Sequence, residues 1–112
     1  MVSIILGFYK RKAGLSHEQF IDHWENMHGH VIKAVPDIEK YVVRYVQHRL
    51  TTIRPRGIEF DGISETWFTD ETARERLFAT PEFKETYADE EQFLDMDATR
   101  WIVVDDQNVV IK

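Results

Sequence analysis

Two adjacent stretches decide the fold: SHEQFIDHWENMHGHVIKAVP, residues 16–36, and IEKYVVRYVQHRL, residues 38–50. Ser16 followed by Gln19 fits a capping box, in which both side chains satisfy free N–H groups of a first helical turn. At 100° per residue, one apolar stripe is formed by Phe20, Trp24, Met27 and Val31. We therefore predict a helix that ends at Pro36 and Asp37, with Gly29 as an alternative end. Residues 38–50 alternate and are rich in Val and Tyr, which predicts a long strand.

The rest of the chain supplies three more strands and two more helical segments. Strands are predicted at 2–9, 62–68 and 99–104, with a short helix from Thr69 or Asp70 to about 79 and a longer one from Pro81 to about 94. Residues 109–111 form an extended tail. The order β-α-β-β-α-β predicts one α+β domain over residues 1–112. Its fold would be ferredoxin-like, with four antiparallel strands and the helices on one face.

One face of such a sheet has no helices to cover its Val, Ile, Tyr and Trp side chains. Exposed apolar patches of that size are rare on monomers. We therefore predict a homodimer in which two sheets pack face to face.

Composition excludes several classes of partner and site. The 112 residues carry 14 Lys and Arg against 20 Asp and Glu, a net charge of −6, which disfavours nucleic acid and anionic membrane as partners. The absence of cysteine excludes disulfides, thiolate metal sites and a Cys nucleophile. The first apolar run is too short to span a bilayer and no signal peptide is recognisable, so a cytoplasmic location is expected.

All five histidines and two of the four tyrosines lie in the helix–strand unit of residues 16–48. Imidazole changes charge near neutral pH, so this grouping indicates a partly apolar pocket for a small organic molecule. His28 is the first candidate, as a general acid or base; the alternative is a histidine at a helix end that interacts only with terminal carbonyls. Tyr41 is the candidate oxyanion donor, or else a core tyrosine. His48 is the third catalytic candidate, or else a solvated strand end or dimer contact.

Strand parity relates these candidates to one another. Tyr41 should face the same way as Tyr45, and His48 the opposite way unless a β-bulge intervenes. The acidic run at 89–91 is interpreted as a solvated helix face, and His17 as a solvated first-turn residue.

Other side chains are candidates for substrate binding, with ordinary core packing as the alternative for the aromatic ones. Glu65 shares parity with Trp67, and an inward carboxylate there needs a partner such as Arg44 or Arg100. The candidate substrate-binding residues are Trp24, Tyr45, Glu65, Trp67 and Phe83.

Metal and nucleotide cofactors are not expected. His23 and His30 are seven residues apart, some 10 Å along a helix, which is too far for one ion. Sequence motifs for phosphate loops, dinucleotide binding and nucleophile elbows are absent.

Several of these motifs together resemble the EthD family of dimeric α+β barrel proteins. They are residues 16–20, His23-Trp24, His28, Pro36, Tyr41, the segment 61–68 and the helix start at 80–83. The family is related to methylmuconolactone isomerase-like enzymes and to polyketide cyclases and decarboxylases. The resemblance implies a pocket between the helices and the sheet, with His28 matching the family's helix histidine and Tyr41 its second-strand tyrosine. This chain differs from the family in two places. It has no histidine in residues 51–60, and it has Gly29-His30 where the family commonly has Ala-Pro.

The sequence thus predicts a cofactor-independent enzyme that acts by histidine-based proton transfer on a small, hydrophobic, carbonyl-bearing molecule such as a lactone, an aromatic or a polyketide-like compound. Isomerisation, dehydration, cyclisation and decarboxylation all fit an enolate intermediate. A non-catalytic binder or accessory protein of a degradative pathway and a cofactor-free monooxygenase are the alternatives. Haem binding through His28 or His30 is a more distant one.

Overall fold

A computed structural model describes residues 2–112 of the chain. Its elements follow the predicted order: β1 Ser3–Tyr9, a helical region, β2 Val42–Arg49, β3 Gly62–Phe68, α3 Glu71–Ala79, α4 Phe83–Phe93 and β4 Arg100–Val104. The four strands form one antiparallel sheet in the order β2-β3-β1-β4. The predicted α+β, ferredoxin-like fold is confirmed. Within residues 2–112, no helix is both long enough and apolar enough to cross a membrane.

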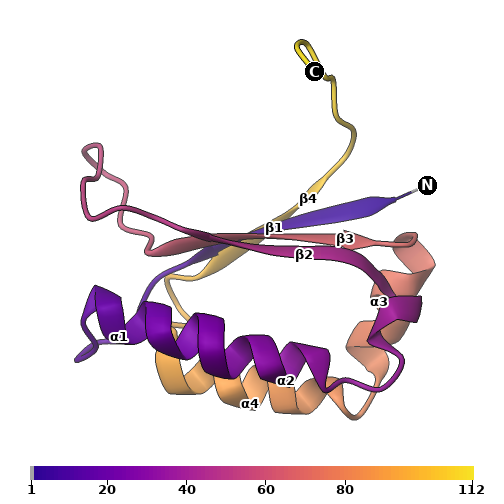
Figure 1. Cartoon of the computed structure of the whole chain (residues 1–112), viewed down its shortest axis with the longest axis horizontal. Helices are drawn as coiled ribbons and strands as arrows, with labels where there is room; N and C mark the ends of the chain where they lie inside the picture. Colours follow the sequence, from indigo (N-terminus) through magenta and orange to yellow (C-terminus); the bar gives the residue numbers. More distant parts are fainter. Residues whose placement is uncertain (1) are drawn as a thin grey trace.

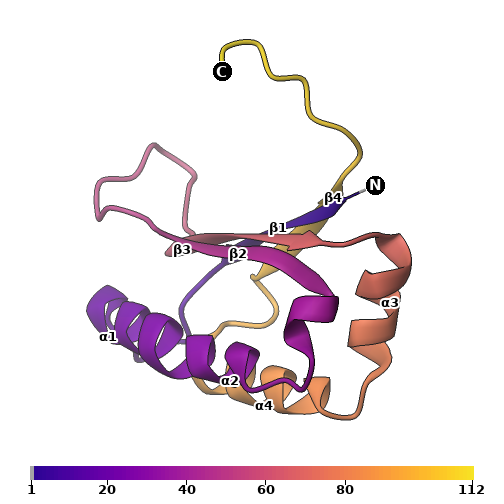
Figure 2. The same cartoon turned by 45° about the vertical axis from the view of Figure 1, so that its right-hand side comes forward.

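The helices lie in a layer on one side of the sheet, and the other side carries none (Figures 1 and 2). The C-terminal segment after β4 extends away from the sheet in both views and takes part in no strand pairing.

The first helical region is not one α-helix. It runs as α1 His17–Asp22, the π-helical segment η1 His23–His28 and α2 Gly29–Lys33. The predicted capping box is present, since the Gln19 N–H donates to Ser16 Oγ and the Ser16 N–H to Gln19 Oε1. Gly29 keeps helical angles and does not end the helical region, which reaches Lys33.

The second strand starts four residues later than predicted. Asp37 adopts a left-handed φ of 57°, and the 3₁₀ turn η2 Ile38–Lys40 follows it. Short side chains such as Asp tolerate this conformation, which turns the chain before it can extend. The strand therefore begins at Val42 and not at Ile38.

Two buried clusters join the helices to the sheet. One forms at the β3–α3 end and contains Ile5, Val35, Phe68, Leu77 and Phe83. The other forms under α1 and η1 and contains Phe20, Ile21, Trp24, Phe93 and Leu94.

Candidate active site

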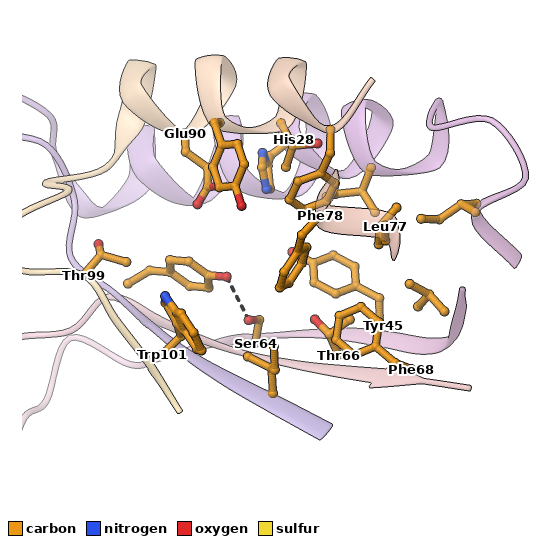
Figure 3. Close-up of a pocket in the computed structure, with 18 of the residues that line it drawn as sticks. His28, Tyr45, Ser64, Thr66, Phe68, Leu77, Phe78, Glu90, Thr99 and Trp101 are labelled. Carbon is orange, nitrogen blue, oxygen red and sulfur yellow. Dashed lines mark hydrogen bonds between the residues drawn. The ribbon is translucent and has the colours of Figure 1, made fainter. Parts of the chain in front are cut away.

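A cavity of about 300 Å³ lies between the helical layer and the sheet (Figure 3). Most of its lining is apolar and comes from the cluster at the β3–α3 end and from aromatic side chains of β4, α3 and α4. Polar residues interrupt this lining at a few places: Tyr9, His28, Tyr45, Ser64, Thr66, Thr86, Glu90, Thr99 and Arg100. A mostly apolar hollow with a few convergent polar groups is typical of a site for a small organic ligand.

The π-helical turn positions His28. The Gly29 N–H donates to the Trp24 carbonyl, five residues back, so each residue of this turn advances by a smaller angle than in an α-helix. Met27, predicted to lie on the buried stripe, is consequently rotated outwards and is 56% exposed. His28 takes the inward position and is 3% exposed. Such π-turns occur often at functional sites.

Asp89 of α4 fixes the orientation of the His28 ring. The Nδ1–H of His28 donates to Asp89 Oδ2 at 2.8 Å, because a carboxylate can only accept. The other ring nitrogen, Nε2, is then free of a proton in the neutral ring. Burial lowers the pKa of His28, although the hydrogen bond and the charge of Asp89 act in the opposite direction. The site therefore holds a neutral imidazole in the tautomer suited to accept a proton.

Glu90 is the next residue of α4, and its carboxyl group reaches the same cavity. Figure 3 shows Glu90 and His28 pointing from the helical layer toward Ser64 and Thr66 on the sheet. Burial, followed by the neighbouring charge of Asp89, raises the pKa of Glu90 to about 7. A substantial fraction of Glu90 is therefore protonated at neutral pH and can donate a hydrogen bond or a proton. A neutral base and a protonated acid next to the same cavity are typical of acid–base sites.

Tyr9 and Ser64 supply hydroxyl groups from the sheet. Ser64 Oγ donates to the Tyr9 hydroxyl oxygen at 3.0 Å, which leaves the Tyr9 O–H free to donate to a ligand. Burial, and to a lesser extent Tyr45, raise the pKa of Tyr9 above its ordinary value, so the phenol stays protonated. A Cβ at Gly7 would lie 2.7 Å from both oxygens, so only glycine leaves room for this pair.

Two further hydroxyl groups lie in the cavity wall. Burial raises the pKa of Tyr45 to about 12, and its oxygen accepts a hydrogen bond from Gln47 Nε2 at 3.4 Å. Thr86 is 2% exposed, and its hydroxyl has no partner among residues 2–112. An unpaired buried hydroxyl costs about 1–3 kcal/mol, which a ligand oxygen would recover.

Of the residues proposed from sequence, His28, Tyr45 and Phe83 line the cavity. Tyr41 does not: it precedes β2, packs against the apolar cluster at the β3–α3 end, and lies 5.8 Å under the Arg76 guanidinium. A bulge between Val42 and Arg44 separates Tyr41 from Tyr45. Strand parity does not apply to Tyr41, because it lies before the strand at the end of the 3₁₀ turn, with helical backbone angles.

The other proposed residues lie away from the cavity. His48 Nε2 lies 2.5 Å from Glu65 Oε2, on the sheet face that carries no helices, and Trp67 lies on the same face. This contact, with help from Trp67 and Arg44, lowers the pKa of Glu65. Trp24 is fully buried in the cluster under η1, with its ring 5.4 Å from Phe20 and 5.6 Å from Tyr9.

Sequence reasoning missed several cavity groups. Asp89 and Glu90 were assigned to a solvated helix face, yet Glu90 follows Phe83 by seven residues, two helical turns, and so shares its buried side. That spacing was the available signal. Tyr9 and Ser64 were seen only as parts of strands. His17 is not solvated either: its Nδ1 lies 2.8 Å from Asp61 Oδ1 and its Nε2 3.0 Å from the Leu50 carbonyl.

Between residues 2 and 112, no three His, Asp or Glu side chains gather in a way that could hold a metal ion. His30, paired with His23 in the sequence argument, is exposed at the start of α2. The relevant partner of His23 is His28, because both rings contact Asp89.

Solved structures share the fold of this chain at low sequence identity. An EthD family protein from Bacillus halodurans C-125 has a TM-score of 0.73 and 17% identity, over 96% of this chain and 100% of its own. A dimeric ferredoxin-like protein from Bacteroides fragilis has a TM-score of 0.67 and 10% identity, over 92% and 94%. SnoaB, a cofactor-independent oxygenase from Streptomyces nogalater, has a TM-score of 0.61 and 14% identity, over 99% and 97%. These likenesses show the fold alone.

Among curated protein sequences, no relative matches the chain. The model of the EthD domain, in contrast, matches residues 12–97. That stretch contains the helical region with His28, strands β2 and β3, and helix α4 with Asp89 and Glu90. Because the match covers most of the chain, this protein belongs to the EthD domain family.

Proposed function

We propose that the protein is a cofactor-independent acid–base enzyme for a small hydrophobic molecule that carries a carbonyl group. The observation that carries this proposal is the buried His28 ring, held by Asp89 through Nδ1 and lining an apolar cavity with a neutral imidazole. Fixing one ring nitrogen leaves the other as a base of defined direction.

The reaction would begin at a C–H bond next to the carbonyl. His28 Nε2 takes the proton, the bonding electrons form the enolate, and the negative charge moves to the carbonyl oxygen. The free O–H of Tyr9 and the protonated carboxyl of Glu90 are the donors available to stabilise that oxygen. Return of the proton to another carbon gives isomerisation, and loss of a leaving group gives a lyase reaction.

Proton exchange in deuterated water tests this step without knowledge of the natural substrate. A bicyclic aromatic ketone such as 1-tetralone is a suitable probe for a cavity of about 300 Å³. We expect the protein to accelerate the exchange of the ketone's α-protons for deuterium, measured by the loss of their NMR signal. His28→Ala should slow this catalysed exchange by on the order of 10²-fold, because the base is lost.

His30→Ala is the matched control, since this histidine is exposed two residues away, and its exchange rate should equal that of the wild type. Equal rates in His28→Ala and wild type, with folding intact by circular dichroism, would refute the proposed base. Binding of the ketone without any catalysed exchange would instead favour a carrier of hydrophobic metabolites.

An oxygenase is the second candidate, and the aromatic lining of the cavity favours it. Tyr87, Trp101 and Phe78 lie at the wall, and SnoaB shows that a cofactor-independent oxygenase exists on this fold. Oxygen uptake in the presence of a hydroquinone, measured with an oxygen electrode, distinguishes this reaction from proton transfer alone.

The chain is further proposed to form a homodimer through the sheet face that carries no helices. On β1 and β4 this face presents Leu6 opposite Ile102, and Ile102 is 53% exposed. One structural neighbour, from Bacteroides fragilis, is itself dimeric. Pairing two copies of the face would cover its apolar side chains.

A further inference from the structure

One carboxylate is shared by two histidines of the π-helical segment. Asp89 Oδ1 accepts from His23 Nε2 at 2.9 Å, and Asp89 Oδ2 accepts from His28 Nδ1 at 2.8 Å. The side chain of His28 is 4% exposed, that of Asp89 14% and that of His23 25%. The three groups therefore form a chain from the cavity to the surface.

The π-turn is what allows this sharing. His23 and His28 are five residues apart, which in an α-helix of 3.6 residues per turn would place them about 140° apart around the axis. In a π-turn the hydrogen bonds span five residues, so side chains with this spacing lie on the same side. Both rings thus reach one carboxylate on α4, and both contact Phe93, with centroid distances of 4.6 Å and 5.2 Å.

One carboxylate cannot neutralise two imidazolium rings. Burial lowers the pKa of His28, and a positive charge on the neighbouring His23 lowers it further. Once His23 is positive, the charge of Asp89 is already compensated, and a second positive charge on His28 is opposed. The apolar Phe93 ring beside both histidines leaves this repulsion poorly screened.

The other titratable groups near His28 come from the sheet and from helix α4. Across the cavity, β1 and β2 contribute the Tyr9 and Tyr45 phenols, whose pKa values are raised, so both are neutral. Helix α4 contributes Glu90, which becomes negative only as the pH passes about 7. Below that pH, the charges near His28 are those of His23, Asp89 and the Arg100 guanidinium of β4, which also lines the cavity.

We propose that His23 is a positioning residue that keeps His28 in its neutral, Nδ1-protonated form by occupying the charge of Asp89. This role rests on the proposed function, in which His28 is the base. His23 does not line the cavity, so it acts through Asp89 and not on a substrate.

Histidine side-chain NMR of the full chain, labelled with ¹⁵N, tests the proposal without any ligand. Nitrogen shifts report the tautomer of His28 and its titration midpoint directly. His23→Gln keeps an N–H donor for Asp89 but removes the charge, whereas His23→Phe keeps the stacking on Phe93 and removes both. In both variants the midpoint of His28 should rise by about half a unit or more, because a nearby positive charge is gone.

His30→Gln is the control, since it removes an exposed histidine of the same helical region, and it should leave the His28 midpoint unchanged. An unchanged midpoint in both His23 variants, with backbone spectra showing an intact fold, would overturn the proposal. A rise in His23→Phe alone would overturn it too, because the hydrogen bond and not the charge would then be responsible. The ketone exchange assay can fail while this titration succeeds, so the two proposals are tested separately.

Discussion

The carboxyl group of Glu90 is a charged side chain in an apolar wall. Its pKa of about 7, raised from 4.5 by burial and then by Asp89, means that folding favours the protonated form. His28 shows the opposite case, since burial lowers its pKa and the folded protein favours the neutral ring. At pH values above the pKa of His28 and below that of Glu90, the site holds a free base and a protonated acid together. Catalysis by the pair should therefore follow a bell-shaped pH profile, with an acid limb below pH 6.5 from His28 and an alkaline limb near pH 7 from Glu90.

Replacing Glu90 by Gln should change how stability depends on pH. In the wild type the unfolded chain ionises above about pH 4.5 while the folded protein keeps its proton to about 7, so stability falls as the pH rises through this window. The penalty is complete above pH 7, at about 2–3 kcal/mol or less. Glu90→Gln removes it, so the variant should gain stability over the wild type between pH 5 and pH 8.

Urea unfolding at pH 5 and at pH 8, followed by tryptophan fluorescence, measures the free energy of unfolding of the variant and of the wild type. Glu85→Gln is the control, because Glu85 is exposed on the same helix and its replacement should give no pH-dependent gain. An equal free-energy difference for Glu90→Gln at pH 5 and pH 8 would contradict the burial of that carboxyl group.

The π-turn is the decisive element-scale feature. It rotates Met27 out, turns His28 in and aligns His23 with it. The bulge in β2 has a comparable effect on the sheet, where Val42 and Tyr45 both line the cavity although they are three residues apart. Each irregularity shifts one chain segment by a single residue, which changes the side chains that reach the cavity.

Replacing two glycines by alanine should change the free energy of unfolding in opposite directions. A Cβ at Gly62 of β3 would overlap the Trp24 ring, so Gly62→Ala should lower the free energy of unfolding by about 1–3 kcal/mol. Gly29 has helical angles and nothing within 4 Å of an added Cβ, so Gly29→Ala should raise it by about 0.5–1 kcal/mol. Denaturant unfolding of both variants checks the pair, and a tolerated Gly62→Ala would show that Trp24 packs elsewhere.

The whole molecule has two layers, a sheet and a set of helices, and one face of the sheet carries no helices. Helices cover one face of the sheet (Figure 1). The opposite face presents apolar side chains such as Leu6 and Ile102 beside the contact between His48 and Glu65. The uncovered face is therefore where a second copy would stabilise the protein.

Ile102→Glu should weaken the proposed dimer, because it places a charge in the centre of an apolar contact. Size-exclusion chromatography with light scattering should give twice the chain mass of 13.3 kDa for the wild type and a lower mass for this variant. Met27→Glu, on the exposed side of the helical layer, should remain dimeric. A wild type of single-chain mass at micromolar concentration would contradict the dimer.

The sequence by itself determined the order of the elements, the capped start of the first helix, the ferredoxin-like fold and the resemblance to the EthD family. These features depend on local hydrogen bonding and on the alternation of apolar residues, both of which are visible along the chain. His28 could be singled out from the grouping of histidines and from the family resemblance. Only the tertiary structure decided that Glu90 and Tyr9 line one cavity with His28, that Asp89 holds the His28 ring, and that His48 and Glu65 lie on the other face. Whether a charged side chain is buried depends on which distant element covers it, and a π-turn or a bulge alters that by one residue without a signal in the local pattern.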